Sequence, residues 1–421
     1  MRDQTPPKIF LALFAGAACL AAVHATAQTE TVLYSFNNST KVQGGKSPEA
    51  PVIFDAAGNL YGTTYYGGNG GSTGCARNGG CGTVFELVPQ AGGGWTEKVL
   101  HNFGHAQDGY NPAAGLVFDK AGNLYGTTVY GGKKYCGIVF ELSPESGGHW
   151  NYTVIYDFCS QSEDADGDLP YGSLIFDSAG NLYGATAEGG LYGTGTVFEL
   201  SPNAGGSWSE KVLYSFGSSF ENGWFPSAPL TLDSAGNLYG AAASGGNYDS
   251  EVCPFGCGVV FELAKTNGEW SENVLYSFST SGTDCVQPNG GLIFDPAGNL
   301  YGTSFYGAGM FELTPQTGGT WTETVTDISG GAYPEAGLVR GASGNLYGTT
   351  LSGGNHSSTG IVFELSPAAG GGFTQRTLFE FNGKDGADPY ASLTLDALGN
   401  LYGTTYKGGA EGGGTVFEIT P

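Results

Sequence analysis

The sequence predicts an all-β fold, a seven-bladed β-propeller of four-stranded antiparallel blades. The pentapeptide Gly-Asn-Leu-Tyr-Gly occurs seven times, starting at Gly58, Gly122, Gly180, Gly236, Gly298, Gly344 and Gly399. Successive copies lie 46 to 64 residues apart (298 to 344 and 58 to 122), which is close to the length of one propeller blade. The 421 residues include 75 glycines, 25 phenylalanines and 24 tyrosines, and only 13% are charged, as is typical of a turn-rich, aromatic-rich β protein.

The first 27 residues have the pattern of a secretory signal peptide. Two basic residues precede an apolar run over residues 9–23, and Ala-Thr-Ala ends at Ala27. We therefore expect residues 28–421 to form a single propeller domain that is secreted, periplasmic or on the cell surface. A lipoprotein alternative would use Cys19, but Gly16 stands where a lipobox prefers leucine. No later segment approaches the roughly 20 apolar residues of a membrane span.

Each repeat contains four runs of strand length, which we name a to d in chain order. In the repeat at residues 170–216, the expected strands are 173–176, 182–186, 195–200 and 208–216. Strand a is apolar on both faces, as expected of a strand between neighbouring sheets. Residues 177–181 should turn the chain from a to b, because Asp accepts bonds from nearby amides and Gly and Asn tolerate positive φ. Four antiparallel strands repeated in this way predict a blade.

The two ends of the chain are predicted to share one blade. The last unit stops at Pro421, directly after its strand c, and so lacks a strand d. Residues 29–36, Thr-Glu-Thr-Val-Leu-Tyr-Ser-Phe, match strand d of the other units. We therefore expect residues 29–36 to complete the blade formed by residues 389–420 and close the ring.

Three motifs together resemble a known family. They are Asp-x-x-Gly-Asn-Leu-Tyr-Gly-Thr-Thr, Gly-Thr-Val-Phe-Glu-Leu and Trp-Ser-Glu-Lys-Val-Leu-Tyr-Ser-Phe. This set resembles the Gloeo/Verruco tandem-repeat family, also called choice-of-anchor GloVer-containing proteins, over essentially the whole mature chain. The resemblance implies an exported bacterial repeat protein, often with a sorting tail, whose biochemical activity is not established. No such tail is found before Pro421.

Charge and cysteine content restrict the compartment and the partners. A net charge of -24 argues against nucleic acid, because phosphate binding needs clustered Lys and Arg. Export favours disulfides among the seven cysteines that follow the signal peptide. The spacing suggests the pairs Cys75 with Cys81, Cys136 with Cys159 and Cys253 with Cys257. Cys285 could replace Cys253 or Cys257, or stay free.

Residues repeated in every blade are most simply structural, so function is sought where the copies differ. Asn59, Tyr61, Phe85, Glu86 and Trp95 belong to the structural set, and we expect Glu86 and its counterparts to form a hydrogen bond between blades. In a propeller, the d-to-a and b-to-c loops emerge on one face, and here they vary. Their aromatic and charged residues form the candidate ligand site: Tyr66, Tyr110, Tyr130, Tyr171, Glu188, Trp224, Tyr306, Tyr333, Tyr390 and Lys407.

Aromatic rings beside carboxylates suit a polyhydroxylated ligand, so a cell-surface or environmental polysaccharide is the expected partner. The alternative is that bulky side chains simply cover glycine-rich loops. A calcium loop is also considered, because Asp164, Asp166 and Asp168 alternate around Gly167. The competing interpretation is a solvated acidic loop, and no other cofactor is expected.

Signals for catalysis are few. The mature chain has four histidines and no Gly-x-Ser-x-Gly elbow or phosphate-binding loop. Carboxylates from different blades could still meet across the channel, as in glycoside hydrolysis. We therefore predict a monomeric binding or structural module, and keep a propeller enzyme of glycosidase, lyase or lactonase type as the alternative.

Overall fold

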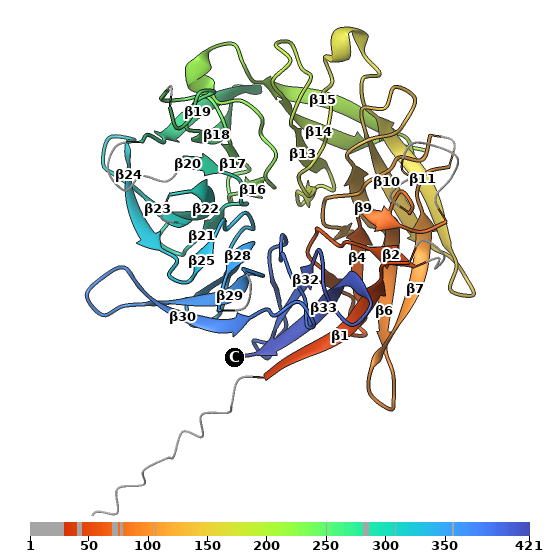
Figure 1. The fold of residues 1–421 in the computed structure, drawn as a ribbon. Helices are drawn as coiled ribbons and strands as arrows, with labels where there is room; N and C mark the ends of the chain where they lie inside the picture. The colour runs from red at the N-terminus through yellow and green to blue at the C-terminus, as the bar shows by residue number, and fades with distance from the viewer. Residues whose placement is uncertain are drawn as a thin grey trace, which may run out of the picture.

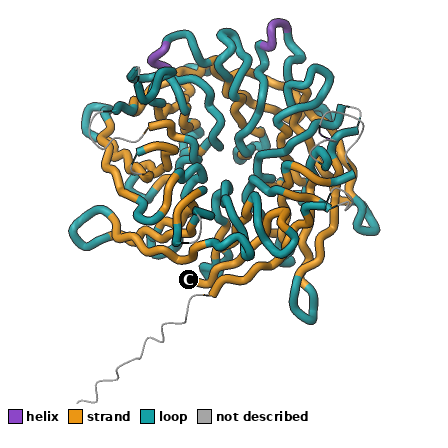
Figure 2. The backbone as a smooth tube through the Cα atoms, in the orientation of Figure 1, coloured by secondary structure: helices purple, strands orange, loops and turns teal. Residues whose placement is uncertain are grey.

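The chain forms a ring of β-sheets (Figures 1 and 2). The computed structural model describes residues 29–39, 44–69, 75, 79–105, 107–249, 251–280, 286–307, 309–355 and 358–421. Over these residues it contains six four-stranded sheets and one five-stranded sheet, with two further two-stranded sheets. The seven-bladed propeller is therefore confirmed. The predicted signal peptide, residues 1–27, and Cys285 lie outside the described residues.

The blades follow one another along the chain, each in the order a to d. Blade 1 contains β3 (Ile53–Phe54), β4 (Leu60–Thr64), β6 (Thr83–Pro89) and β7 (Trp95–Asn102). Blade 2 contains β8 (Val117–Phe118), β9 (Leu124–Thr128), β10 (Ile138–Pro144) and β11 (Trp150–Asp157). Blade 3 contains β12 (Ile175–Phe176), β13 (Leu182–Thr186), β14 (Thr196–Pro202) and β15 (Trp208–Ser215). Blade 4 contains β16 (Thr231–Leu232), β17 (Leu238–Ala242), β18 (Val259–Thr266) and β19 (Glu269–Ser277).

The remaining blades keep this pattern. Blade 5 contains β21 (Ile293–Phe294), β22 (Leu300–Tyr306), β23 (Gly309–Pro315) and β24 (Trp321–Asp327), and β20 (Val286–Pro288) also pairs with β22. Blade 6 contains β26 (Val339–Arg340), β27 (Leu346–Thr350), β29 (Ile361–Pro367) and β30 (Phe373–Glu380). Blade 7 contains β31 (Thr394–Leu395), β32 (Leu401–Thr405), β33 (Gly412–Thr420) and β1 (Thr29–Asn37).

The first and last strands of the described chain close the ring, as predicted. β1 pairs antiparallel with β33, from Thr29 opposite Thr420 to Asn37 opposite Gly412. In Figure 1 the red β1 lies beside the blue β33. Blade 7 is thus built from both ends of the chain, and its outer strand leaves no unpaired edge on β33.

The d-to-a and b-to-c loops meet on one face. In each blade, the residue two positions after the five-residue core of strand b pairs with a residue of the incoming d-to-a loop. In blades 1 and 6 this pairing forms small sheets, β2 (Gly45–Lys46) with β5 (Tyr66–Gly67) and β25 (Gly331–Ala332) with β28 (Ser352–Gly353). In blade 5 it is the pair Val286 and Tyr306. The other blades use single bridges: Tyr110 with Tyr130, Asp168 with Glu188, Trp224 with Ser244 and Ala387 with Lys407.

The Gly-Asn-Leu-Tyr-Gly motif forms the hairpin between strands a and b. In blade 1, Asp55 Oδ1 accepts bonds from the backbone amides of Ala57 (2.8 Å) and Asn59 (2.9 Å). Asp55 Oδ2 accepts a bond from the Asn59 side chain at 2.8 Å, and Gly58 has φ 86°. These short-range bonds explain why the pentapeptide recurs: each blade needs the same tight turn.

One expectation about strand c was wrong. Glu86 does not form the expected hydrogen bond to a neighbouring blade. It accepts a bond from the Tyr61 hydroxyl at 3.0 Å within its own sheet, where the two residues lie directly opposite each other. Blades 4 to 7 repeat this Tyr–Glu pair. The physical reason is the cross-strand register, which puts tyrosine and glutamate side chains on the same face of the sheet.

Side-chain hydrogen bonds between blades come from other residues, including strand-b threonines and strand-d tyrosines. On strand b, the Thr63 hydroxyl of blade 1 donates to the Ala114 carbonyl ahead of blade 2 at 3.0 Å. The Tyr34 hydroxyl of blade 7 donates to Glu97 of blade 1 at 3.0 Å. Tyr214 of blade 3 donates in the same way to Glu272 of blade 4 at 2.7 Å. The strand-d bonds tie the outer strands of adjacent blades together.

The apolar core lies between blades. One cluster joins Val139 and Phe158 of blade 2 to Phe198 and Leu200 of blade 3. Within each blade, the strand-c phenylalanine is fully buried over the strand-b glycine, as Phe198 lies over Gly184. A Cβ atom at Gly184 would lie 2.6 Å from Phe198 Cζ and 2.9 Å from Leu174 Cδ2. The motif glycine is therefore required by packing.

We expect Gly184→Ala to lower the melting temperature, because overpacking of this kind costs about 1–3 kcal/mol. Gly370→Ala is the matched control, since no atom lies within 4 Å of a Cβ built at Gly370. The control should be neutral or slightly stabilising. Thermal unfolding followed by circular dichroism measures both variants, and equal melting temperatures for the two would contradict this packing argument.

Candidate functional site

In each d-to-a loop, a proline packs against the glycine near the start of strand c. Pro170 packs against Gly137, which precedes strand c of blade 2; a Cβ atom at Gly137 would lie 2.7 Å from the Pro170 ring. The same contact recurs in other blades, for example between Pro48 and Gly414. The residue after each loop proline is therefore held in an equivalent place in every blade. These residues are Glu49, Ala113, Tyr171, Ser227, Asn289, Glu335 and Tyr390.

Two of these residues are carboxylic acids from loops that are distant in sequence, Glu49 and Glu335. Glu49 lies between blades 7 and 1, and Glu335 lies between blades 5 and 6. Burial, and secondly the charge of Glu335, raises the pKa of Glu49 to about 8. Burial also raises the pKa of Glu335. Within the described part of the chain, neither carboxyl makes a hydrogen bond or ion pair, so both can receive a ligand.

Tyrosines from several blades surround Glu49. Burial, and then the Glu49 charge, raises the pKa of Tyr65 in blade 1 and brings that of Tyr406 in blade 7 to about 12. Burial comes first for Tyr171 and Tyr390 as well, and the Glu49 charge also raises their pKa values. The Tyr390 and Tyr406 rings are 5.4 Å apart. We call Glu49, Glu335 and these four tyrosines the mouth site.

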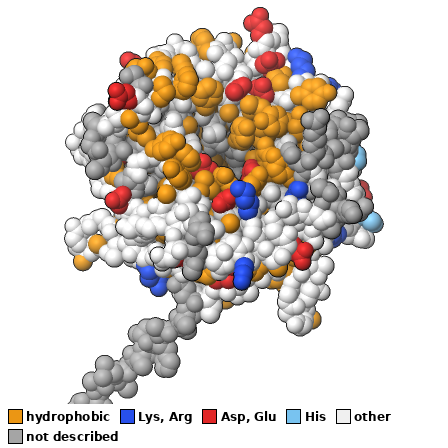
Figure 3. All heavy atoms as spheres, in the orientation of Figure 1, with side chains coloured by type: hydrophobic (Ala, Val, Ile, Leu, Met, Phe, Trp, Pro, Cys, Tyr) orange, Lys and Arg blue, Asp and Glu red, His pale blue; other side chains and the backbone are white. Residues whose placement is uncertain are grey.

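The surface view agrees with this composition. Figure 3 shows a hollow at the centre of the molecule, bordered by side chains of the hydrophobic class, which includes tyrosine, with acidic side chains among them. A concave site of aromatic faces with a few polar groups is the usual form of a ligand-binding site.

Several predicted residues extend this site. Tyr66 contacts Tyr65 edge to face at 4.8 Å. Tyr130 stacks on Tyr110 at 5.5 Å, and a bond between Tyr130 and Tyr171 contributes to the raised pKa of Tyr171, after burial. A further two residues lie at its edge: Lys407 forms an ion pair with Asp388 at 3.0 Å, and Glu188 lies opposite Asp168.

The other predicted residues form separate aromatic clusters. Tyr306 and Tyr333 lie beside Phe305, which stacks on Tyr333 at 4.9 Å. Trp224 contacts Phe220 at 4.9 Å. Ring contacts therefore place Trp224, and the pair Tyr306 and Tyr333, in groups of their own, and ligand binding by the ten predicted residues stays a prediction.

Glu49, Glu335, Tyr65 and Tyr406 were missed from the sequence. Two signals could have found them. Glu49 and Glu335 follow the repeated loop proline, and Tyr65 and Tyr406 directly follow strand b, two positions at which the seven copies differ. The sequence does not show which of these variable positions point toward the centre of the ring.

In the acidic loop that follows blade 2, the carboxylate of Asp166 has a structural role. Asp166 is fully buried and accepts bonds from the Tyr156 hydroxyl at 2.7 Å and from the Ser160 amide at 2.9 Å. Asp164 is exposed, in the 3-10 turn η2 (Ser162–Asp164), and Asp168 pairs with Glu188. Calcium binding by these three residues stays a prediction.

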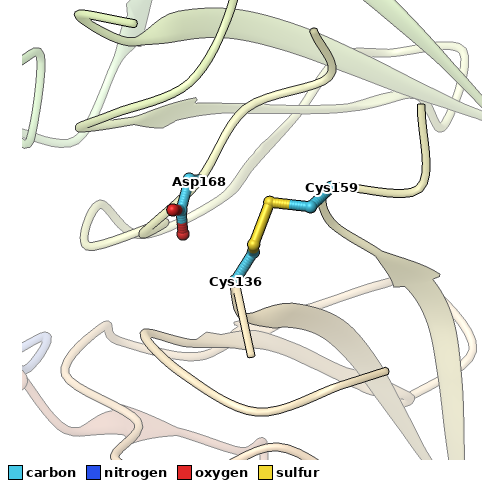
Figure 4. A group of neighbouring side chains, drawn as sticks. All are labelled: Cys136, Cys159 and Asp168. Carbon is cyan, nitrogen blue, oxygen red and sulfur yellow. A yellow bond between two sulfur atoms is a disulfide. The ribbon is translucent and has the colours of Figure 1, made fainter. Parts of the chain in front are cut away.

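The three suggested disulfides are present: Cys75–Cys81, Cys136–Cys159 and Cys253–Cys257. Asp168 lies near the second of them (Figure 4). Among the described residues this is the only group of three potential ligand atoms within 4.8 Å of one another. Its two sulfur atoms are joined in a disulfide, so they offer no thiolates to a metal.

The described histidines do not belong to a group of three potential metal ligands. His101 stacks on Tyr152 at 3.8 Å and lies 3.2 Å from Asp108, whereas His105 is exposed. His356 lies outside the described residues. No helix in the described part of the chain is long and apolar enough to cross a membrane.

Solved structures share the fold. A streptogramin B lyase is 14% identical, with a TM-score of 0.53, over 93% of this chain and 97% of that chain. The extracellular domain of a candidate hybrid two-component system from B. thetaiotaomicron is 14% identical, with a TM-score of 0.53, over 93% of this chain and 41% of that chain. A candidate 6-phosphogluconolactonase from Bacteroides uniformis is 11% identical, with a TM-score of 0.51, over 78% and 83%. At these identities the likeness shows the fold alone.

No curated protein matches the chain in sequence. A family model does match it, in three overlapping segments at residues 16–163, 70–310 and 304–421. These segments contain all seven copies of the pentapeptide and every strand of the ring. The chain therefore belongs to the Gloeobacter/Verrucomicrobia repeat family.

Proposed function

We propose that this protein binds a glycan at the mouth site. The observation that carries the proposal is that tyrosines from different blades lie close enough to Glu49 for its charge to add to burial in raising their pKa values, while Glu49 has no hydrogen-bond or ion-pair partner among the described residues. Tyrosine faces stack on the C–H faces of sugars, and tyrosine hydroxyls and carboxyls bond to sugar hydroxyls. A carboxyl with a pKa of about 8 is mostly protonated at neutral pH and can donate a hydrogen bond as well as accept one.

The expected setting is outside the cytoplasm. Three disulfides among the described residues favour an oxidising compartment. A cell-surface or environmental polysaccharide is therefore the proposed partner, and a monomer is the proposed state of the protein.

Glycan-array screening of residues 28–421 tests the proposal. We expect Tyr171→Ala to weaken binding of the best array ligand at least tenfold, a loss of about 1.4 kcal/mol. Tyr110→Ala should weaken it less, because Tyr110 contacts the mouth site through Tyr130. Trp224→Ala is the control, since Trp224 lies in a different aromatic cluster, and should leave the affinity unchanged. Binding to no glycan, or equal losses in Tyr171→Ala and Trp224→Ala, would contradict the proposal.

A second candidate function is glycoside cleavage at the same site. Glu49 and Glu335 come from different blades, and the raised pKa of Glu49 is what a general acid requires. Incubating the array ligand with the wild type, Glu49→Gln and Glu335→Gln decides between the two functions. Release of new reducing ends by the wild type, lost in both variants, would establish cleavage, whereas binding without release would establish a binding module.

A further inference from the structure

Two cavities adjoin each other outside the mouth site. The smaller, of about 190 Å³, is lined by Asp108, Tyr110, Lys133 and Tyr135. The larger, of about 510 Å³, also contacts Asp108 and Lys133 and extends to Ser160 on the d-to-a loop after blade 2. Because the same residues line both, they form one groove across the outer part of blade 2. The volume of the larger cavity alone lies within the usual range for ligand sites, about 300–1,000 Å³.

Side-chain contacts connect this groove to the mouth site. Tyr171 of the mouth site bonds to Tyr130, Tyr130 stacks on Tyr110 at 5.5 Å, and Tyr110 lines the smaller cavity. Burial, followed by the neighbouring Tyr130 and Tyr135 hydroxyls, raises the pKa of Tyr110. A row of tyrosines therefore leads outward from Glu49 to Tyr135, whose side chain is 63% exposed.

The far end of the groove offers polar groups. Asp157 and Lys133 form an ion pair at 3.8 Å, and both line the larger cavity. Ser160 and Tyr156, also in its lining, have hydroxyl groups 3.1 Å apart. This end of the groove therefore offers hydroxyls, a carboxylate and an amine beside aromatic rings. Like the mouth site, it can form hydrogen bonds with sugar hydroxyls.

The Cys136–Cys159 disulfide joins the loop beside the smaller cavity to the loop beside the larger one. Cys136 follows Tyr135 in sequence, and Cys159 precedes Ser160. The two Cα atoms are 6.0 Å apart and 23 residues apart in sequence. The disulfide, shown in Figure 4, thus holds the loop that carries Tyr135 against the loop that carries Ser160.

We propose that the ligand is a linear oligosaccharide that runs from the mouth site along Tyr130 and Tyr110 into this groove, whose Tyr135 and Ser160 loops are joined by the Cys136–Cys159 disulfide. This inference rests on the proposed glycan function and specifies the ligand class: a chain of several sugar units. A short sugar fills only the mouth site, and additional units contact Tyr135 and the polar end of the groove.

Calorimetric titration with oligosaccharide ladders tests this inference. The probes are cello-, xylo-, manno- and chito-oligosaccharides of two to six units. For the ladder that binds, we expect the wild-type Kd to fall at least tenfold from the dimer to the hexamer. Tyr135→Ala should remove most of this gain and leave the dimer Kd within about twofold of wild type. Tyr248→Ala, at an equally exposed tyrosine of blade 4 (61%), should leave the whole ladder unchanged.

The disulfide has its own test. The double variant Cys136→Ser/Cys159→Ser should bind the dimer as the wild type does. It should lose the gain in affinity with chain length, because the Tyr135 and Ser160 loops are no longer joined. A dimer that binds with a Kd independent of further length, or a Tyr135→Ala variant that keeps the full gain, would overturn the inference and leave the glycan function standing. Absence of binding to every ladder and every array glycan would instead overturn the glycan function itself.

Discussion

Removal of strand β1 is expected to abolish the stable closed ring. β1 supplies the outer strand of blade 7, and Phe36 at its end is fully buried. Phe36 packs in one cluster with Val416 of blade 7 and Phe85 of blade 1, so the strand holds two blades together. Loss of Phe36 alone should cost about 3–5 kcal/mol. Loss of the whole strand also exposes the edge of β33, which favours aggregation.

Two truncations separate this effect from that of the N-terminal segment. A chain that starts at residue 29 keeps β1 and should melt as the chain of residues 28–421 does. A chain that starts at residue 38 should aggregate on size-exclusion chromatography, or melt at a much lower temperature by circular dichroism. An unchanged melting curve for the second chain would show that β1 does not close the ring.

Lowering the pH from 8 to about 5.5 is expected to stabilise the protein. Burial is the first cause that raises the pKa of Glu49 to about 8, and those of Glu30, Glu210 and Glu272 to about 7, above the usual 4.5. Between pH 4.5 and these values the folded chain holds protons that the unfolded chain has released. The free energy of unfolding therefore falls as pH rises through this window. Glu49 is the most buried of the four and contributes most to this change, whereas the partly exposed carboxyls contribute less because solvent screens them.

Glu49→Gln isolates the largest of these contributions. Glutamine carries no charge, so the variant should melt at a higher temperature than the wild type at pH 8.5. The two proteins should melt together at pH 4.5, where Glu49 is protonated in the folded chain. Glu145→Gln, at an exposed position on the c-to-d turn of blade 2, is the control and should match the wild type at both pH values. If Glu49→Gln melts at or below the wild-type temperature at pH 8.5, then Glu49 is not a buried carboxyl that destabilises the fold on ionisation.

Local bonding made the blades predictable. Strand b of blade 3 was predicted at residues 182–186 and is Leu182–Thr186 in the structure. The turn before it forms because Asp177 accepts bonds from amides two and four residues ahead, a contact that short-range sequence encodes. Strand a was less accurate: residues 173–176 were predicted, and only Ile175–Phe176 pair, since burial of Leu174 does not require a partner strand.

The sequence shows which residues repeat in every blade, but it does not always show which residues they contact. The glutamate of strand c bonds within its own sheet, because Tyr61 lies opposite Glu86, and this depends on register. The bonds between blades come from other residues, as between Tyr34 and Glu97 on strand d and from Thr63 to Ala114 on strand b. Neither partner choice can be deduced from spacing alone.

The sequence by itself determined the number of blades, their hairpins and the strand that closes the ring, because each follows from a repeated local pattern or from simple counting. It suggested three disulfide pairs but left the partner of Cys285 open. Only the tertiary structure decided the mouth site. Glu49 and Glu335 lie in loops that are distant in sequence, and the charge of Glu335 adds to burial in raising the pKa of Glu49 because ring closure places blade 1 next to blade 7. The physical reason is that the inward direction of a loop residue depends on how its blade is tilted and closed, and this is a property of the whole ring.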